Sequence, residues 1–141
     1  MNESKPNFLG VTPYLHYDDV NAMIDWLTSV FGFQERGRWL DTQGVLRNAE
    51  LYVGDTEVWL DGDPEYWSQR GRRPEEWIGI WVDDVDAMHA RVKDAGIEVA
   101  PPKNEFYAVR TFNVVDPEGY TWGFLQRAPY IAHFESQPGS E

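Results

Sequence analysis

The chain has 141 residues, enough for one domain that buries its own core without disulfides or a structural metal. It contains no cysteine, which excludes disulfide frameworks, thiolate metal sites, iron–sulfur clusters and cysteine nucleophiles. Its 24 acidic and 12 basic residues give a net charge of −12 with no basic stripe, so we expect no nucleic-acid partner.

The first half of the chain, residues 9–62, predicts a strand, a helix and three further strands. We expect the first strand over residues 9–17. The helix has apolar residues at helical spacing over residues 20–31, and Asp18 or Asp19 caps its start. Turn residues separate the three strands that follow, which we expect at residues 34–40, 45–53 and 57–61.

A six-residue phrase occurs twice. Asp18-Asp19-Val20-Asn21-Ala22-Met23 returns as Asp83-Asp84-Val85-Asp86-Ala87-Met88, an offset of 65 residues. In both copies a short strand-like run precedes the phrase, and a helical stretch that ends at Gly32 or Gly96 follows it. Because strand, acidic cap, helix and glycine recur in the same order, we interpret the halves as two copies of one βαβββ unit.

The second copy follows a linker in which Tyr66 and Trp67 favour one helical turn. Its helix is expected over residues 85–95. Its strands are expected at residues 77–82, 97–100, 110–115 and 120–126, with one strand lost or weakly formed between Pro101 and Val109. The chain is thus predicted to be a single α+β domain, residues 1–141, with a polar arm at 2–7, module one at 9–62, the linker at 63–75, module two at 76–128 and a polar tail at 129–141 that frays.

The paired aspartates resemble catalytic carboxylates, but their position at helix starts is explained by capping and the helix dipole. We therefore assign no catalytic residue. Seven each of Trp, Tyr and Phe exceed the needs of a small core, which favours a pocket or an interface lined with rings. The negative charge would attract cationic ligands, although solubility alone also explains it.

Three features together resemble the vicinal oxygen chelate superfamily, which includes glyoxalase I, bleomycin-resistance proteins and extradiol dioxygenases. They are the Asp-Val-x-Ala-Met helix start in both halves, Phe31-Gly32-Phe33, and the turn Asp116-Pro117-Glu118-Gly119 followed by Tyr120-Thr121-Trp122. The resemblance covers residues 9–127. It implies two βαβββ modules that form a curved mixed sheet with a concave ligand cleft. It also implies a homodimer, with clefts often completed between subunits.

Enzymes of this superfamily usually hold a divalent metal with His and Glu from the first and last strands of each module. The corresponding positions here fall at Thr12, Trp77, Gly123 and Trp59. None of these side chains replaces His or Glu as a ligand, so the resemblance implies no metal and no cofactor. The alternative is a shifted, incomplete site that uses His16 with Glu57 or Asp61.

Alternation along the expected strands places an aromatic set on the concave face. We expect the ligand-binding residues to be Tyr14, His16, Trp59, Trp77, Trp81, Tyr107, Arg110 and Phe112, with Thr12 beside them. Trp122 belongs either to this face or to the helix-covered face. His16 serves either as a hydrogen-bonding pocket residue or as a general base, and Arg110 either pairs with an acidic residue or clamps an anionic group.

We therefore predict a metal-independent small-molecule-binding protein of the glyoxalase/bleomycin-resistance type, which sequesters a planar ligand, cationic ones included, as in antibiotic resistance. Two alternatives stay open. One is an enzyme of the same superfamily, either a lyase, isomerase or dioxygenase with relocated metal ligands or a metal-free catalyst using His16 with Tyr14 or Tyr107. The other is a metabolite-binding module. Without a signal peptide or a long apolar run, we expect a cytoplasmic protein with no membrane partner.

Overall fold

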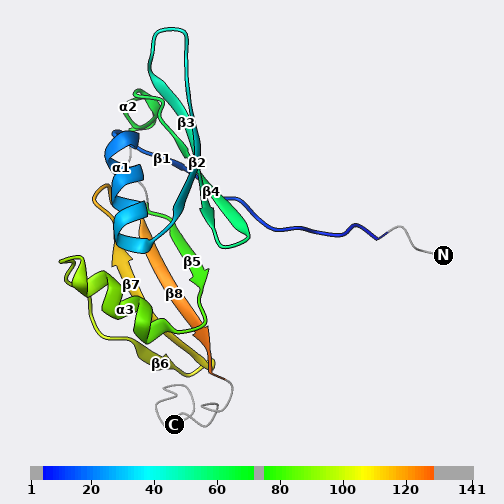
Figure 1. Ribbon diagram of the computed structural model, residues 1–141, viewed down its shortest axis with the longest axis vertical. Helices are drawn as coiled ribbons and strands as arrows, with labels where there is room; N and C mark the ends of the chain where they lie inside the picture. Colours follow the sequence, from blue (N-terminus) through cyan, green and yellow to red (C-terminus); the bar gives the residue numbers. More distant parts are fainter. Residues whose placement is uncertain (1–4, 72–74, 129–141) are drawn as a thin grey trace.

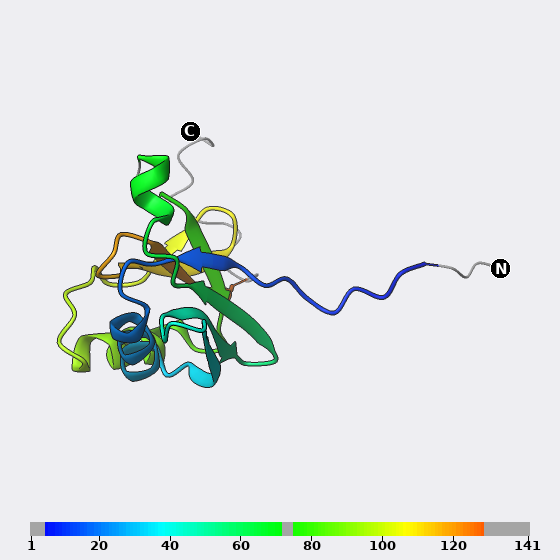
Figure 2. The same cartoon turned by 90° about the horizontal axis from the view of Figure 1, so that it is seen from above.

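The computed structural model describes residues 5–71 and 75–128, and Figures 1 and 2 show it from two directions. Its strands form two four-stranded mixed sheets, one from each half of the chain. The predicted α+β fold of two βαβββ modules is confirmed. Within the described residues, no helix is long and apolar enough to cross a membrane. The expected polar tail at 129–141 lies outside the described residues.

Module one forms the first sheet. Its strands are β1 (Tyr14–His16), β2 (Gln34–Leu40), β3 (Leu46–Val53) and β4 (Thr56–Asp61). Between β1 and β2 the chain forms α1 (Val20–Trp26), which continues as the π-helical segment η1 (Leu27–Phe31). The helix ends at Gly32, where φ is 85°. Glycine adopts this left-handed conformation without strain, which explains the residue at this helix end.

Module two repeats the plan after α2 (Tyr66–Arg70), the helical turn expected in the linker. Its elements are β5 (Trp77–Trp81), α3 (Val85–Asp94), β6 (Lys103–Glu105), β7 (Val109–Val115) and β8 (Thr121–Arg127). The side chains of Asp19 and Asp84 accept hydrogen bonds from the backbone N–H groups of Ala22 and Ala87, respectively. These aspartates are therefore helix caps, as predicted.

The repeat is preserved in strand order and in register. The sheets run β1-β4-β3-β2 and β5-β8-β7-β6, and the first pair is parallel in each. Tyr14 pairs with Trp59 in module one. The equivalent pair in module two is Gly79 with Gly123. Equivalent positions of the two halves therefore occupy equivalent places in the two sheets.

The helix-covered faces of both sheets share one hydrophobic core. Trp122 and Phe124 of β8 contact Phe31 of η1 edge-on, with ring centroids 5.6 and 4.9 Å apart. Trp122 is fully buried in this core. It therefore lies on the helix-covered side of its sheet, one of the two placements expected from the sequence.

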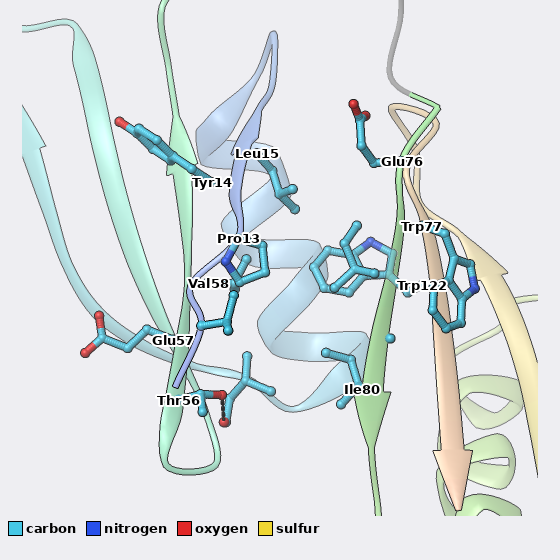
Figure 3. Close-up of a pocket in the computed structure, with 14 residues that line it drawn as sticks. Pro13, Tyr14, Leu15, Thr56, Glu57, Val58, Glu76, Trp77, Ile80 and Trp122 are labelled. Carbon is cyan, nitrogen blue, oxygen red and sulfur yellow. Dashed lines mark hydrogen bonds between the residues drawn. The ribbon is translucent and has the colours of Figure 1, made fainter. Parts of the chain in front are cut away.

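The faces of the two sheets that are turned away from α1 and α3 point away from each other. In Figure 3, Tyr14 and Glu57 project to one side of module one, whereas Trp77 projects to the far side of module two. We call these surfaces outer face one and outer face two. Outer face one carries Tyr14, His16, Asn48, Glu57, Trp59 and Asp61, and outer face two carries Trp77, Trp81, Thr111, Asn113 and Leu125.

Two expected strands differ from the structure. The first strand begins at Tyr14 rather than at residue 9. In the register that pairs Tyr14 with Trp59, residues 9 and 10 would lie opposite the turn at Gly54 and Asp55, and Pro13 has no N–H group to donate to the sheet. The strand expected at residues 97–100 does not form, and this stretch is a loop whose Ile97 and Val99 pack against the core. The short strand β6 lies instead in the interval between Pro101 and Val109, where a weakly formed strand was expected.

Candidate functional site

Outer face two is hollowed by a cavity of about 700 Å³. The strands of the second sheet and the loop before β7 form its walls. The lining residues include Trp77, Trp81, Tyr107, Thr111, Asn113 and Arg127. The structure thus brings together Trp77, Trp81 and Tyr107, three of the residues that we expected to bind a ligand.

The indole of Trp77 lies flat over the sheet because two glycines leave room for it. A Cβ atom added to Gly79 would lie 2.8 Å from the Trp77 ring, and one added to Gly123 would lie closer still. The indole N–H donates a 3.0 Å hydrogen bond to Oδ1 of Asn113, which fixes the ring across β8. The side chain is nevertheless 52% exposed. Trp77 therefore presents a fixed, open plane on which another ring can stack.

Trp81 has a different environment, although it is 51% exposed. The guanidinium carbon of Arg127 lies over its ring, 4.1 Å from the centroid. One side of the indole is therefore already covered by a cation of the protein itself. A cationic ligand would compete with Arg127 at Trp81 but meets no such competitor at the open plane of Trp77.

Thr111 is a lining residue that the sequence analysis missed. Its Oγ1 is buried and has no hydrogen-bond partner among the residues that the structure describes. A buried hydroxyl without a partner destabilises the protein. Asn113 lies two residues further along the same strand and uses its carbonyl oxygen to hold Trp77. β7 therefore presents to the cavity the Thr111 hydroxyl, which can donate or accept a hydrogen bond, and the Asn113 amide N–H groups, which can donate.

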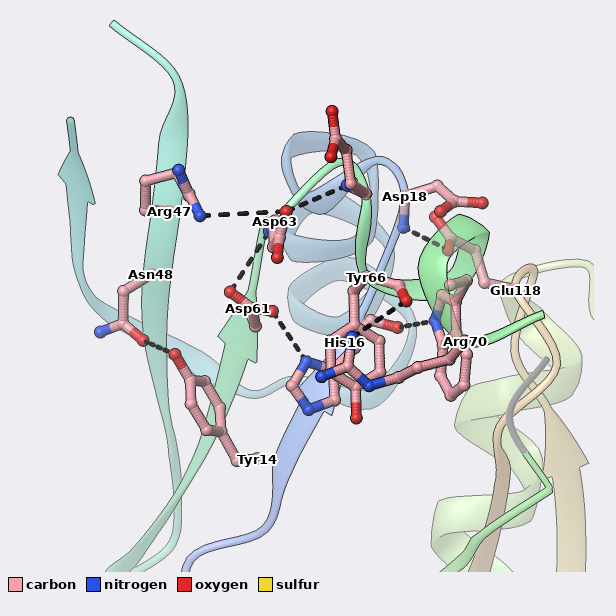
Figure 4. A network of polar contacts seen from close by, with 12 residues as sticks. Tyr14, His16, Asp18, Arg47, Asn48, Asp61, Asp63, Tyr66, Arg70 and Glu118 are labelled. Atoms are coloured by element: carbon pink, nitrogen blue, oxygen red, sulfur yellow. Dashed lines mark hydrogen bonds and ion pairs between the residues drawn. The ribbon is translucent and has the colours of Figure 1, made fainter. Parts of the chain in front are cut away.

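On outer face one, β1 and β4 place His16 beside Asp61. The residues are register partners, and Nδ1 of His16 lies 2.7 Å from Oδ2 of Asp61 (Figure 4). The imidazole stacks on Tyr66 of α2, with ring centroids 3.5 Å apart and the planes within 3°. The guanidinium carbon of Arg70 also lies over the Tyr66 ring, at 3.8 Å. His16 therefore has the carboxylate partner that orients a general base, which sequence reasoning did not assign to it.

The rest of outer face one is polar. The Tyr14 hydroxyl donates a 3.0 Å hydrogen bond to Asn48, and the indole N–H of Trp59 donates one of 2.7 Å to Glu57. Burial raises the pKa of the Tyr14 phenol, and the nearby Asp61 carboxylate raises it further. Tyr14, His16 and Trp59 thus lie together, as expected, but on the opposite side of the molecule from Trp77 and Trp81.

Two of the expected ligand-binding residues lie on the helix-covered side of β7. Phe112 is 4% exposed, and its ring stacks on Phe124 in the core. Arg110 forms hydrogen bonds of 2.8 and 3.0 Å to the two carboxylate oxygens of Asp86 on α3. The expected alternation of β7 was wrong by one residue. Val109, Thr111 and Asn113 of β7 line the cavity instead. Arg110 pairs with an acidic residue, which is one of the two roles that we considered for it.

The residues at the metal positions do not form a set of metal ligands. Across the described ranges, no three His, Asp or Glu side chains come together as a metal site requires. His16 and Asp61 are residue types that can ligate a metal, but their side chains are hydrogen-bonded to each other. Trp77 and Gly123, at positions where ligands were expected in module two, offer no basic atom. The donor set therefore does not fit a divalent cation.

Comparison with known proteins identifies the family. The sequence model described as the Glyoxalase/Bleomycin resistance protein/Dioxygenase superfamily matches residues 11–124. The chain belongs to this superfamily. The match includes every strand except the end of β8, so both modules are superfamily modules. No curated protein matches the chain at a significant level.

Several solved structures share the fold. TioX from Micromonospora sp. ML1 is 30% identical, with a TM-score of 0.72 over 85% of this chain and 99% of that chain. A bleomycin resistance determinant encoded on transposon Tn5 is 17% identical, with a TM-score of 0.67 over 85% and 98% of the chains. Lactoylglutathione lyase from Agrobacterium tumefaciens is 20% identical, with a TM-score of 0.67 over 86% and 96%. The superfamily thus includes resistance proteins and enzymes on one fold.

Proposed function

We propose that this superfamily member is a metal-independent binding protein that sequesters a planar small molecule, cationic ones included, against Trp77. The observation that carries the proposal is the indole plane of Trp77, seated over Gly79 and Gly123 and open toward a cavity of about 700 Å³. Cavities of this size suit small ligands, and stacking and cation–π contacts supply affinity at such a plane. Sequestration of a drug or metabolite requires binding alone.

The charge of the protein favours a cation as the ligand. The net charge of −12 gives a negative field around the molecule, which raises the rate at which cations arrive. Outer face one contributes carboxylates to this field, among them Glu57 and Asp61. Because such long-range attraction is screened beyond about 10 Å at 0.1 M ionic strength, added salt should weaken capture.

We infer further that a second copy of the chain completes the site. The cavity lies on outer face two, and outer face one of the same chain points the other way (Figure 3). In a homodimer, outer face one of each chain can close the cavity on outer face two of the other chain. Each ligand would then lie between Trp77 of one chain and the Tyr14 side of the other.

The binding proposal is tested by fluorescence titration of the protein with planar cations, including bleomycin and 1-methylquinolinium. We expect quenching that saturates, a several-fold weaker affinity for Trp77→Ala, and partial recovery for Trp77→Phe, which keeps a ring. Trp81→Ala should have the smaller effect because Arg127 already covers that ring. Circular dichroism checks that each variant is folded. Absence of binding by every probe, together with turnover of a substrate, would replace this proposal with an enzymatic one.

A mixing experiment tests whether the site lies between chains. Trp77→Ala and Tyr14→Ala each remove one side of every composite site. In a mixed dimer of the two variants, one site combines the wild-type Tyr14 side of one chain with the wild-type Trp77 of the other. When subunits exchange at random, half of the dimers are mixed, and each mixed dimer has one intact site. Mixing equal amounts of two weakly binding variants should therefore restore about a quarter of the high-affinity sites, whereas a site formed within one chain would show no recovery.

A second candidate function is metal-free proton transfer, which the His16–Asp61 pair favours. The 2.7 Å contact orients the imidazole as in a general base, and the stack on Tyr66 holds the ring in place. Such an enzyme would lose turnover in His16→Gln and most of it in Asp61→Asn while ligand affinity stayed near wild type. Equal loss of affinity and turnover in both variants would instead indicate a binding role for His16.

A further inference from the structure

The hydroxyl of Thr111 differs from the other polar groups that line the cavity on outer face two. The Asn113 carboxamide and the Arg127 guanidinium each contact an indole. Glu105 forms an ion pair of 3.4 Å with Lys103. The Oγ1 atom of Thr111 is instead buried, and it has no hydrogen-bond partner among the residues that the structure describes. A molecule in the cavity can supply the partner that the protein does not.

The packing of the sheet does not require this hydroxyl. Thr111 pairs with Leu125 on one side and with Lys103 on the other. Val109, two residues earlier on the same face of β7, and Leu125 are both buried and apolar. Valine would fill the space of Thr111 with nearly the same shape, so the hydroxyl only lowers the stability of the empty protein. A polar group with such a cost is expected where it contributes to function.

Thr111 lies within reach of a ligand that stacks on Trp77. The indole of Trp77 lies over Gly123, whose register partner on β7 is Asn113. Thr111 precedes Asn113 by two residues, so it faces the same side of the sheet about 7 Å along the strand. A two-ring ligand that stacks on the indole and extends along the sheet brings a substituent on its edge to Thr111.

The hydrogen-bonding groups at this point favour an acceptor on the ligand. The Asn113 carbonyl oxygen is held by the indole N–H, which leaves the two amide N–H groups as donors. The Thr111 hydroxyl can donate as well, and a carbonyl oxygen has two lone pairs to accept both bonds. We propose that the site selects planar ligands that carry a carbonyl oxygen at the ring edge, with Thr111 as the specificity-determining residue. The inference rests on the binding proposed above, but all of its residues belong to one module of one chain.

Two probes that differ in one group test the inference. One is 1-methylquinolinium with an acetyl group on the carbon meta to the ring nitrogen. The other carries an ethyl group on the same carbon, so it has the same ring, the same charge and nearly the same size without the carbonyl oxygen. Isothermal titration calorimetry measures the affinity of both probes for each protein. The ratio of the two affinities cancels any effect of a substitution on stacking or charge that both probes share.

We expect wild type to bind the acetyl probe roughly tenfold more tightly than the ethyl probe, because only the acetyl oxygen gives the buried hydroxyl a partner. Thr111→Val should remove most of this preference. Thr111→Ser keeps the hydroxyl and should retain the preference. Asn113→Asp keeps an oxygen that can hold Trp77 but has no N–H groups, so it should lose part of the preference.

Thr121→Val is the matched control. It makes the same exchange on the neighbouring strand β8, at a position outside the cavity lining, and should keep the wild-type ratio. Circular dichroism checks that each variant is folded. The same ratio in wild type and Thr111→Val would overturn the inference, and the binding proposal would still stand if Trp77→Ala weakened both probes. Binding of neither probe to wild type would overturn the binding proposal and this inference together.

Discussion

The hydroxyl of Tyr17 donates a 2.6 Å hydrogen bond to Oδ2 of Asp116, although 99 residues separate the two in sequence. Tyr17 directly follows β1, and Asp116 begins the turn before β8. The same buried carboxylate accepts hydrogen bonds from the indole N–H of Trp122 at 3.0 Å and from the backbone N–H of Tyr120 at 3.1 Å. The turn by which the superfamily was recognised therefore also joins the two modules.

Removal of the Tyr17 hydroxyl should destabilise the whole chain. Tyr17→Phe leaves a buried carboxylate with one donor fewer, so we expect the free energy of unfolding to fall by about 1–3 kcal/mol. Urea denaturation measures the change. Tyr107→Phe, at an exposed ring, is the matched control and should change stability by less than about 0.5 kcal/mol. Equal stability of both variants would show that the bond between the modules contributes nothing.

Two tyrosines should resist ionisation in alkali. Burial raises the pKa of Tyr120 to about 12 and that of Tyr17, whose hydroxyl also meets the Asp116 charge, further. Above the ordinary pKa of 10.0 the unfolded chain loses these protons while the folded chain keeps them, so stability falls as pH rises. Absorbance at 295 nm should show both phenols ionising only as the protein unfolds. Ionisation of all seven tyrosines in the folded protein near pH 10 would contradict this.

Thr111→Val should stabilise the protein without ligand. The buried hydroxyl of Thr111 lacks a partner among the described residues, and valine has nearly the same shape without the polar atom. We expect a gain of about 1 kcal/mol in the free energy of unfolding. Thr111→Ser keeps the hydroxyl and removes a methyl group, so it should lose stability. A destabilised Thr111→Val would mean that the hydroxyl is paired in solution.

Gly123→Ala should weaken ligand binding through Trp77. The new methyl group would overlap the indole, which must then leave its position over the sheet. A double-mutant cycle separates this effect from others. We expect Gly123→Ala to cost several-fold in affinity in the wild-type background and little in Trp77→Ala. The same loss in both backgrounds would show that Gly123 acts independently of the indole.

Arg110→Gln should leave ligand affinity unchanged and reduce stability slightly. The hydrogen bonds from Arg110 lower the pKa of Asp86. The pair therefore contributes stability above the ordinary carboxylate pKa of 3.8, and this contribution is lost as pH falls through the lowered value. Because the pair is largely exposed, we expect less than about 1 kcal/mol near pH 7 and no difference from wild type in strong acid. A loss of affinity would place Arg110 in the site.

The fold could be predicted because its signals are local and occur twice. Acidic caps, helical spacing and terminal glycines recur in both halves, and each half folds into the same order of strands. The first strand was placed too early because Leu9 and Val11 alternate as a strand does. Alternation cannot tell whether a partner strand exists in the same chain. In the register of β1 with β4, Leu9 would lie opposite the turn at Gly54, and Pro13, directly before β1, lacks a backbone N–H donor.

The candidate site could be predicted only in part. Exposed aromatic residues on β1, β4 and β5 were found because polar or small residues flank them. The orientation of β7 was predicted wrongly because both of its faces have nearly the same hydropathy. Its buried residues, Val109, Thr111, Phe112 and Val114, are divided between the two faces. Asp61 was expected near His16 only as one of two alternative metal ligands, beside Glu57. The direct contact between the two side chains depends on the parallel register of β1 and β4, which the sequence does not specify.

The separation between outer faces and core makes this chain a scaffold for grafting. Side chains on outer face two contact the cavity rather than the residues that hold the modules together, so they can be exchanged for those of another superfamily member without redesign of the interior. Ligand preference can then be changed by substituting outward-facing residues of β5, β7 and β8, while Trp122 and its neighbours in the core are kept. Substitutions at a few positions on outer face two would thus change which ligand is bound, while the buried core continues to determine the stability of the fold.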